Sequence, residues 1–148
     1  MHATYAVAGG SHVTLLLTRD ETEGALDVIE VLAQPGGGPP AHRHAFGEWF
    51  EVLEGELTIC EERDAAIVPT HTLTAGESLW VAPWEYHAAM NLSHAPVRFR
   101  VTGTPGAVTG YVAAAGVLVP DELATPARTP PDPAELAGIA SRWGIEFW

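Results

Sequence analysis

Short runs of apolar residues, bounded by glycine, proline or charged residues, recur along most of the chain. Within residues 97–101, Val97, Phe99 and Val101 alternate with two arginines, which is the pattern of a half-buried strand. The other runs are too short for independent helices, and they lie at residues 12–18, 25–33, 49–53, 56–60, 79–82 and 87–91. Many short strands at regular spacing predict an all-β sandwich or barrel.

The C-terminal third has a different pattern. Apolar residues with helical spacing predict a short helix before Gly116, namely Val108, Tyr111, Val112 and Ala115. Residues 117–131 contain four prolines and are expected to form an extended connector. Asp132 then stands as an N-cap with Glu135 three residues later, which predicts a final helix that ends at Gly144.

These patterns divide the chain into two parts. Residues 1–116 are expected to form the barrel, with its N-terminal strands and a short following helix. Residues 117–148 are expected to form the connector and a helix that packs on the barrel or on a partner subunit. The total of 148 residues suits one globular unit of ordinary size.

The charge of the chain excludes several kinds of function. Its formal net charge is −12, and all seven basic residues are arginine. Without lysine the chain cannot form a Schiff base or a P-loop, and an acidic surface disfavours nucleic acid. The single cysteine, Cys60, forms no internal disulfide and is expected to be a small buried residue. No apolar run is long enough for a membrane span and no signal peptide is evident, so we expect a soluble cytoplasmic protein with no membrane partner.

Two histidines follow the Gly/Pro-rich segment 35–40. Side chains alternate along a strand, so His42 and His44 share one face, and Glu48 shares it if the strand continues without a bulge. Two imidazoles and a carboxylate inside a barrel are costly unless a charged partner meets them, and a divalent metal is the simplest one. The alternative is that both histidines are exposed loop residues beside a proline turn.

The spacing of these residues extends into a longer pattern. The positions at fixed spacing are Gly36, His42, His44, Glu48 and Gly55, followed later by Gly76, His87 and Asn91. They match two motifs of the cupin superfamily, and the chain resembles the small single-domain bacterial cupins that are similar to quercetin dioxygenases. The resemblance covers residues 9–103 and extends more weakly to the last helix. Ala82 and Trp84 depart from it, since the second motif usually has a proline and a glycine there.

The resemblance implies an antiparallel jelly-roll barrel with C-terminal accessory helices, and a metal centre inside it. In that family His42, His44, Glu48 and His87 would bind one divalent ion; the position of His87 rests on the resemblance alone. The ion could be iron, nickel, manganese, cobalt, copper or zinc. Four protein ligands leave coordination positions open, as in catalytic sites, and Glu48 would also accept a proton from the substrate.

Apolar residues near the motifs are expected to form a pocket for an aromatic substrate: Phe46, Phe50, Val52 and Trp80. The resemblance favours a dioxygenase acting on a phenolic or flavonol-like compound. Two alternatives remain open: a non-redox cyclase or isomerase of an aromatic polyketide, and a barrel that binds a small ligand without catalysis.

Other side chains are expected to lie at the surface. Trp49 and Leu53 share the strand face opposite Glu48, and an exposed apolar face of this kind predicts a homodimer. Solvent exposure is expected for the remaining histidines and for a rim of carboxylates, namely His2, His12, His71, His94, Glu51, Glu54, Glu56, Glu61 and Glu62.

Overall fold

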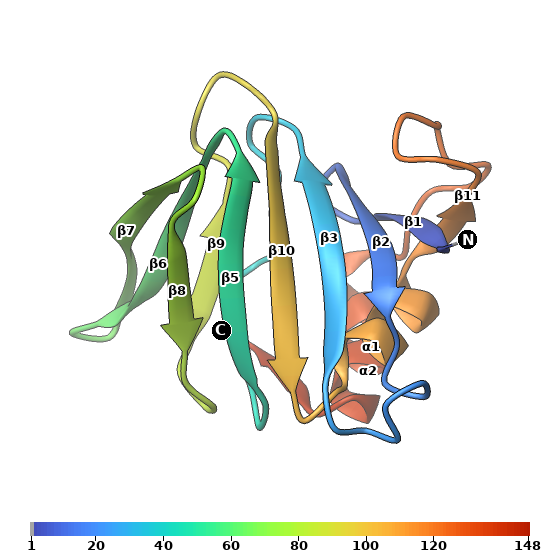
Figure 1. The fold of residues 1–148 in the computed structure, drawn as a ribbon. Coiled ribbons are helices and arrows are strands. Elements are labelled where there is room, and N and C mark those ends of the chain that lie inside the picture. Colours follow the sequence, from blue (N-terminus) through green and yellow to red (C-terminus); the bar gives the residue numbers. More distant parts are fainter. Residues whose placement is uncertain (1) are drawn as a thin grey trace.

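Two antiparallel sheets face each other and form a barrel in the computed structural model, which describes residues 2–148 (Figure 1). The first sheet has seven strands in the order β11 (Val117–Val119), β1 (Thr4–Val7), β2 (Ser11–Leu17), β3 (Asp27–Ala33), β10 (Val97–Thr104), β5 (Gly47–Glu54) and β8 (Ser78–Val81). The second has five, in the order β12 (Ile145–Phe147), β4 (His42–His44), β9 (His87–Met90), β6 (Glu56–Arg63) and β7 (Ala66–Thr74). The predicted all-β antiparallel barrel is confirmed.

The core lies between the sheets because apolar side chains alternate along the strands. Val97, Phe99 and Val101 of β10 are buried, while the two intervening arginines point outwards and pair with carboxylates. From the opposite sheet, Leu57 and Ile59 of β6 have no exposed surface. Burial of each such side chain stabilises the fold by about 1.5–3 kcal/mol relative to exposure.

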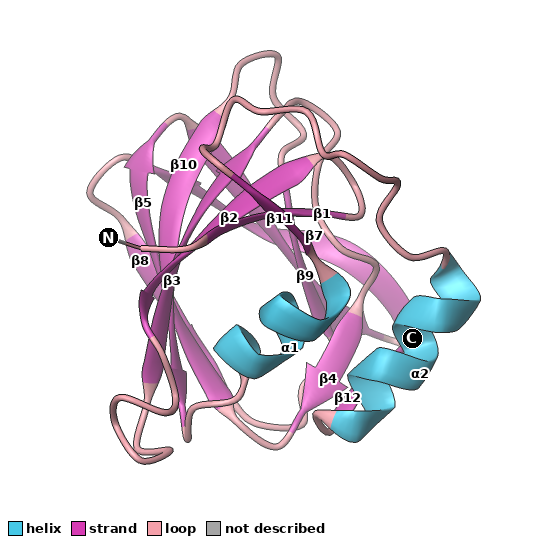
Figure 2. Cartoon of the chain, turned by 90° about the vertical axis from the view of Figure 1, so that its right-hand side faces the viewer, coloured by secondary structure: helices cyan, strands magenta, loops and turns pink. Residues whose placement is uncertain are grey.

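Both predicted helices are present, as α1 (Val108–Ala115) and α2 (Pro133–Arg142). The Asp132 side chain accepts a hydrogen bond from the backbone N–H of Glu135 at 2.9 Å, so the predicted N-cap is confirmed. Figure 2 shows α1 across the opening between the sheets and α2 outside it. Gly110 of α1 lies against the Trp143 ring, where a Cβ atom would overlap the ring carbons. None of the helices within residues 2–148 is long and apolar enough to cross a membrane.

Several strands lie outside the predicted runs. β11 occupies the start of the segment that was expected to be a connector, so that expectation is wrong for residues 117–119. β7 was not predicted because it is rich in polar residues and contains Pro69, which an edge strand tolerates. β12 follows α2 with only three residues, too few to show a period.

Candidate metal centre

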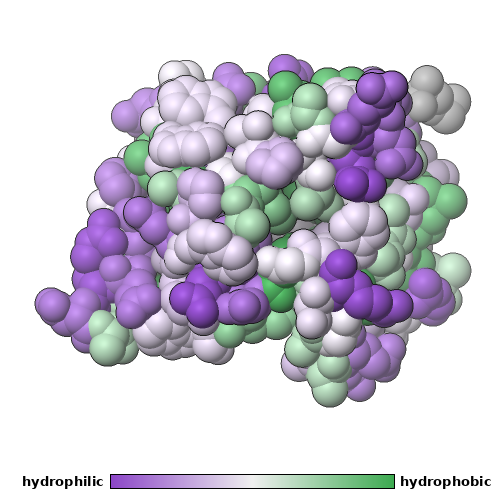
Figure 3. Space-filling view, turned by 90° about the horizontal axis from the view of Figure 1, so that it is seen from below, coloured by the Kyte–Doolittle hydropathy of each residue, from purple (hydrophilic) through white to green (hydrophobic). Residues whose placement is uncertain are grey.

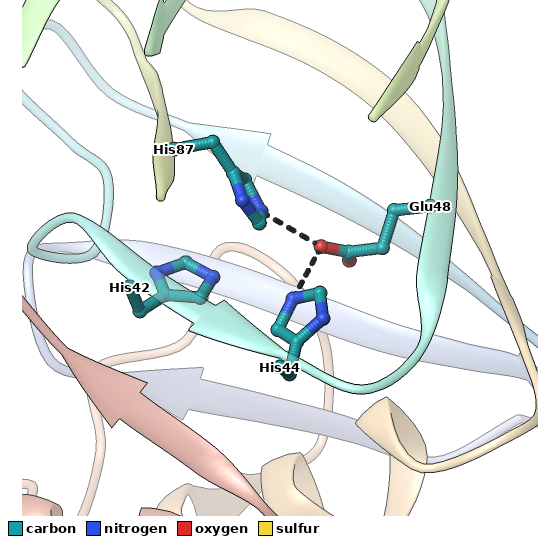
Figure 4. A group of neighbouring side chains, drawn as sticks. All are labelled: His42, His44, Glu48 and His87. Atoms are coloured by element: carbon teal, nitrogen blue, oxygen red, sulfur yellow. Dashed lines mark hydrogen bonds and ion pairs between the residues drawn. The ribbon is translucent and has the colours of Figure 1, made fainter. Parts of the chain in front are cut away.

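The two sheets bring four side chains to one point inside the barrel (Figure 4). His42 and His44 come from β4, His87 from the neighbouring β9, and Glu48 from β5. One ligand atom from each residue lies within 4.8 Å of the corresponding atoms of the others. The structure therefore brings together all four residues expected to bind a metal.

Glu48 reaches this point by a route that the sequence did not predict. The strand does not continue from His44 to Glu48: β4 ends at His44, the chain turns, and β5 begins at Gly47 in the opposite sheet. The condition on which Glu48 would share the strand face of His42 and His44, an unbroken strand, is therefore not met, whereas the two histidines do share one face of β4. The Glu48 carboxylate faces the three histidines across the barrel interior, so the ligands come from both sheets.

Each histidine ring is oriented by a backbone carbonyl. Nδ1 lies 2.8 Å from the Pro40 oxygen in His42, 2.7 Å from the Phe46 oxygen in His44, and 2.8 Å from the Glu85 oxygen in His87. A carbonyl only accepts hydrogen bonds, so Nδ1 carries the proton and donates it. Nε2 of each ring is thus left as the nitrogen that can bind an ion, the arrangement found around metal-bound histidines.

The charges at the centre also suit a cation. Glu48 is only 5% exposed, and its Oε1 lies 2.8 Å from His44 Nε2 and 3.0 Å from His87 Nε2. Burial alone would raise the pKa of Glu48, but the contacts with these two rings, whose Nε2 carries a proton when no ion is bound, outweigh it and lower the pKa. Burial, together with the nearby His87, lowers the pKa of His42 to about 4, so this ring is neutral at pH 7.

The donor set fits a divalent ion. Nε2 of His44 is buried and has no partner of normal hydrogen-bond geometry among residues 2–148, although it lies close to Glu48. A buried nitrogen without a partner is costly, and a bound cation would remove that cost. Three imidazole nitrogens and one carboxylate are ligands for zinc and for redox-active first-row metals.

Apolar side chains flank the centre as expected, with one exception. The Phe46 ring stacks on His44 with centroids 3.6 Å apart, and the Phe50 ring meets His87 edge-on at 6.3 Å. Val52 is buried further along the same face of β5. Trp80, however, is 46% exposed on the outer face of the sheet, where it pairs with Trp49, so it does not line the barrel interior.

The altered turn of the second motif keeps a left-handed conformation. Trp84 lies where the resemblance to cupins leads one to expect glycine, and its φ is 64°. Its backbone N–H donates a hydrogen bond to the His44 oxygen at 2.7 Å. The turn is therefore attached to the ligand strand although a bulky residue adopts the left-handed conformation there.

Three residues near the centre were missed or misplaced by sequence reasoning. Glu61 is not on a solvated rim: it is buried, pairs in register with His87 and accepts a hydrogen bond from Thr70. Asp27 is fully buried, and its Oδ1 has no partner in the part of the chain that the structure describes. The sequence signal available for Asp27 was a lone acidic residue at the start of an apolar run. Phe147 also lies near the centre, where its ring meets His42 edge-on at 6.3 Å, but no local pattern in the sequence marked it.

The other surface expectations hold with one exception. His2, His71 and His94 are exposed, as are Glu51, Glu54, Glu56 and Glu62. His12 is half-buried because its Nε2 lies 2.8 Å from the Ala124 oxygen of the C-terminal segment. Cys60 is buried as predicted.

Solved structures with a similar fold include proteins of different activities. An oxalate oxidase in complex with glycolate is 24% identical, with a TM-score of 0.56, and the match covers 68% of this chain and 55% of the oxidase. This chain therefore spans little more than half of that protein. An RmlC-like cupin from Shewanella frigidimarina is 23% identical, with a TM-score of 0.56, and the match covers 70% of this chain and 83% of that one. The polyketide cyclase RemF from Streptomyces resistomycificus is 18% identical, with a TM-score of 0.56 and 68% of each chain covered. These likenesses show the fold alone.

No curated protein matches the chain. The model of the cupin domain family matches residues 29–103, a range that includes all four residues of the centre. Those residues form half of the chain and supply most strands of the barrel. The chain therefore belongs to the cupin domain family.

Proposed function

We propose that this protein is a metal-dependent dioxygenase that acts on a phenolic or flavonol-like aromatic compound. The observation that carries the proposal is the buried set of three oriented histidines and one carboxylate, His42, His44, His87 and Glu48, which would hold one divalent ion. When bound, a redox-active ion with open coordination positions supplies Lewis acidity and electron transfer for oxygen chemistry.

The residues around the centre account for binding and proton transfer. Both histidine contacts of Glu48 fall on Oε1, so Oε2 is the oxygen that accepts the proton of a substrate hydroxyl. The rings of Phe46 and Phe50 border the histidines, and their apolar faces favour a flat aromatic molecule and exclude water.

A non-redox reaction is the second candidate. The fold is shared with a polyketide cyclase and with a sugar phosphate isomerase from Silicibacter pomeroyi. The same ligand set could act on a carbonyl group without oxygen, with Glu48 moving the proton. Ligand binding without catalysis is the remaining alternative, since fold does not determine function.

Oxygen uptake separates these candidates. The protein is loaded in turn with iron, nickel, manganese, cobalt or copper and mixed with catechol or a flavonol, beside His87→Ala treated in the same way. Oxygen consumption that is lost in the variant supports the proposal. Product formation under anaerobic conditions would favour the cyclase or isomerase, and recovery of unchanged ligand after long incubation would favour a binding protein.

We also propose that the protein forms a homodimer through the outer face of β5 and β8. Trp49 and Trp80 pair across these strands and are 40% and 46% exposed, and β8 is an edge strand. Such an aromatic patch suits burial against a second copy. Light scattering at micromolar concentration is expected to give twice the chain mass for the wild type and the chain mass for Trp80→Ser, and a monomeric wild type would exclude the dimer.

A further inference from the structure

The last residues of the chain form a strand that lies directly beside the ligand strand. β12 runs antiparallel to β4, and its register pairs Ile145 with His44 and Phe147 with His42. Figure 2 shows the two strands side by side, with α2 leading into β12. A segment about 100 residues further along the chain is therefore the immediate neighbour of two ligands.

β12 supplies most of the backbone pairing of β4. On its other side β4 meets β9 at a single register pair, His42 with His87. On the β12 side all three residues of β4 are paired, and the Trp148 N–H extends the contact by donating to the Ala41 oxygen at 2.8 Å. On the β9 side the backbone N–H of Trp84 adds one hydrogen bond to the His44 oxygen, so only β12 pairs with β4 along its whole length.

Side chains reinforce this pairing on both faces of the sheet. On the inner face, Ile145 is buried and the Phe147 ring meets the His42 ring edge-on at 6.3 Å. On the outer face, Glu146 accepts a hydrogen bond from Arg43 at 2.8 Å, and both side chains are partly exposed. The inner contacts reach a ligand, whereas the outer pair only connects the strands.

Phe147 contacts the least buried of the three histidines. His44 and His87 are almost completely buried, but His42 is half-buried. Phe147, beside His42, is also half-buried. Figure 3 views the molecule from the end where the β4–β5 and β8–β9 turns lie, and hydrophilic and hydrophobic residues are mixed over this face.

We propose that residues 145–148 are a positioning element of the metal centre. Their pairing with β4 fixes His42 and His44, and the Phe147 side chain holds the His42 ring. The inference rests on the metal site of the proposed function. Because metal binding and docking of β12 both require an ordered β4, each favours the other by the same free energy. Removal of β12 weakens metal binding, and metal binding in turn stabilises the docked position of β12.

Cobalt titration tests the first half of this coupling. Co²⁺ reports both affinity and ligand geometry through its visible absorption. Phe147→Ala and a chain that ends at Gly144 are expected to bind Co²⁺ about 10–100-fold more weakly, as outer partners of metal ligands do when removed, with altered absorption bands. Phe147→Leu keeps part of the contact and is expected to recover part of the affinity. Glu146→Gln removes only an exposed ion pair and is expected to bind like the wild type.

Hydrogen exchange of the full-length chain tests the second half, and it does not require the shortened chain to fold. Adding Co²⁺ to the wild type is expected to slow exchange of the amides of residues 145–148, with little change in β7 on the far edge of the same sheet. Equal Co²⁺ affinity of Phe147→Ala and the wild type, with unchanged exchange in β12, would overturn this inference and leave the metal site intact. Failure of the wild type to bind Co²⁺ would overturn the proposed function as well.

Discussion

Substitution of Asp27 by asparagine probes a buried carboxyl group near the centre. Asp27 pairs in register with Gly103 of β10, and Gly103 pairs with Glu48 on its other side. Asp27 Oδ2 accepts hydrogen bonds from the backbone N–H and the hydroxyl of Thr109 at 2.7 and 2.8 Å. It thereby caps α1, whose own N-cap residue, Ala107, provides no side-chain acceptor.

The second oxygen of Asp27 has no partner within residues 2–148. Oδ1 lies 2.7 Å from the position that a Cβ atom of Gly103 would occupy, so the glycine makes room for it. An unpaired buried polar group costs about 1–3 kcal/mol, and more when it is charged. An asparagine side chain would keep the cap through its carbonyl oxygen, and its amide group would lie unpaired where Oδ1 lies, but the buried charge would be gone. Because an unpaired charge costs more than an unpaired neutral group, Asp27→Asn is expected to gain up to about 1 kcal/mol in the free energy of unfolding at pH 7.

Alanine at the same position is expected to have the opposite effect. Asp27→Ala removes both hydrogen bonds to Thr109, and bonds to a charged group contribute about 1.5–3 kcal/mol. Two such bonds are lost, while removal of the unpaired Oδ1 returns about 1–3 kcal/mol, so the net loss is about 2 kcal/mol. This loss corresponds to a fall of roughly 4–8 °C in melting temperature for a chain of this size. The asparagine and alanine substitutions are therefore expected to change the free energy of unfolding in opposite directions.

The pH dependence of stability gives an independent check. Burial raises the pKa of Asp27, the charge of Glu48 adds to the rise, and the hydrogen bonds from Thr109 oppose it. A carboxyl whose pKa is higher in the folded than in the unfolded chain contributes stability below its unfolded pKa, and this contribution is lost as pH rises through the folded pKa. The advantage of Asp27→Asn over the wild type should therefore grow from pH 4 towards neutrality.

Urea unfolding of the three proteins between pH 4 and 8, followed by circular dichroism, measures these differences. Thr109→Val is the matched control, because it removes one donor to Asp27 Oδ2 but leaves Oδ1 as it is. This variant should lose stability, without the advantage over the wild type that Asp27→Asn gains as pH rises. A loss of more than about 1 kcal/mol in Asp27→Asn at pH 7 would refute the reasoning, because it would mean that Oδ1 has a partner that an amide cannot replace.

Three further predictions concern the metal, the strained turn and the cysteine. Zn²⁺ at 100 times its dissociation constant should raise the free energy of unfolding by about 2.7 kcal/mol, which is a rise of roughly 5–10 °C in melting temperature. His87→Ala should show no such rise, and an unchanged melting temperature of the wild type would contradict metal binding. Trp84→Gly should be about 1 kcal/mol more stable than Trp84→Ala in urea unfolding, because a φ of 64° strains alanine but not glycine. Equal stability of the two variants would contradict the strain. Burial raises the pKa of the Cys60 thiol, so iodoacetamide at pH 8 should alkylate it more slowly in the folded than in the urea-unfolded protein, by about tenfold or more. Equal rates would show that the thiol is accessible.

Features that depend on neighbouring residues could be read from the sequence. The alternation of Val97, Phe99 and Val101 determines which face of β10 is buried, and the cap at Asp132 determines where α2 begins. These signals are local, because strand parity and helix capping act within a few residues. The spacing of His42 and His44 likewise puts both rings on one face of β4.

Features that depend on the pairing of distant segments were decided only by the tertiary structure. Parity gives the face of a strand but not its sheet, so it could not show that Glu48 meets the histidines from the opposite sheet or that Trp80 points outwards. Nothing near Phe147 indicated a strand beside His42, because the two residues are brought together by a pairing across about 100 positions. The sequence by itself determined the fold class and the chemical types of the ligands, whereas the packing of the two sheets determined the geometry in which those ligands meet.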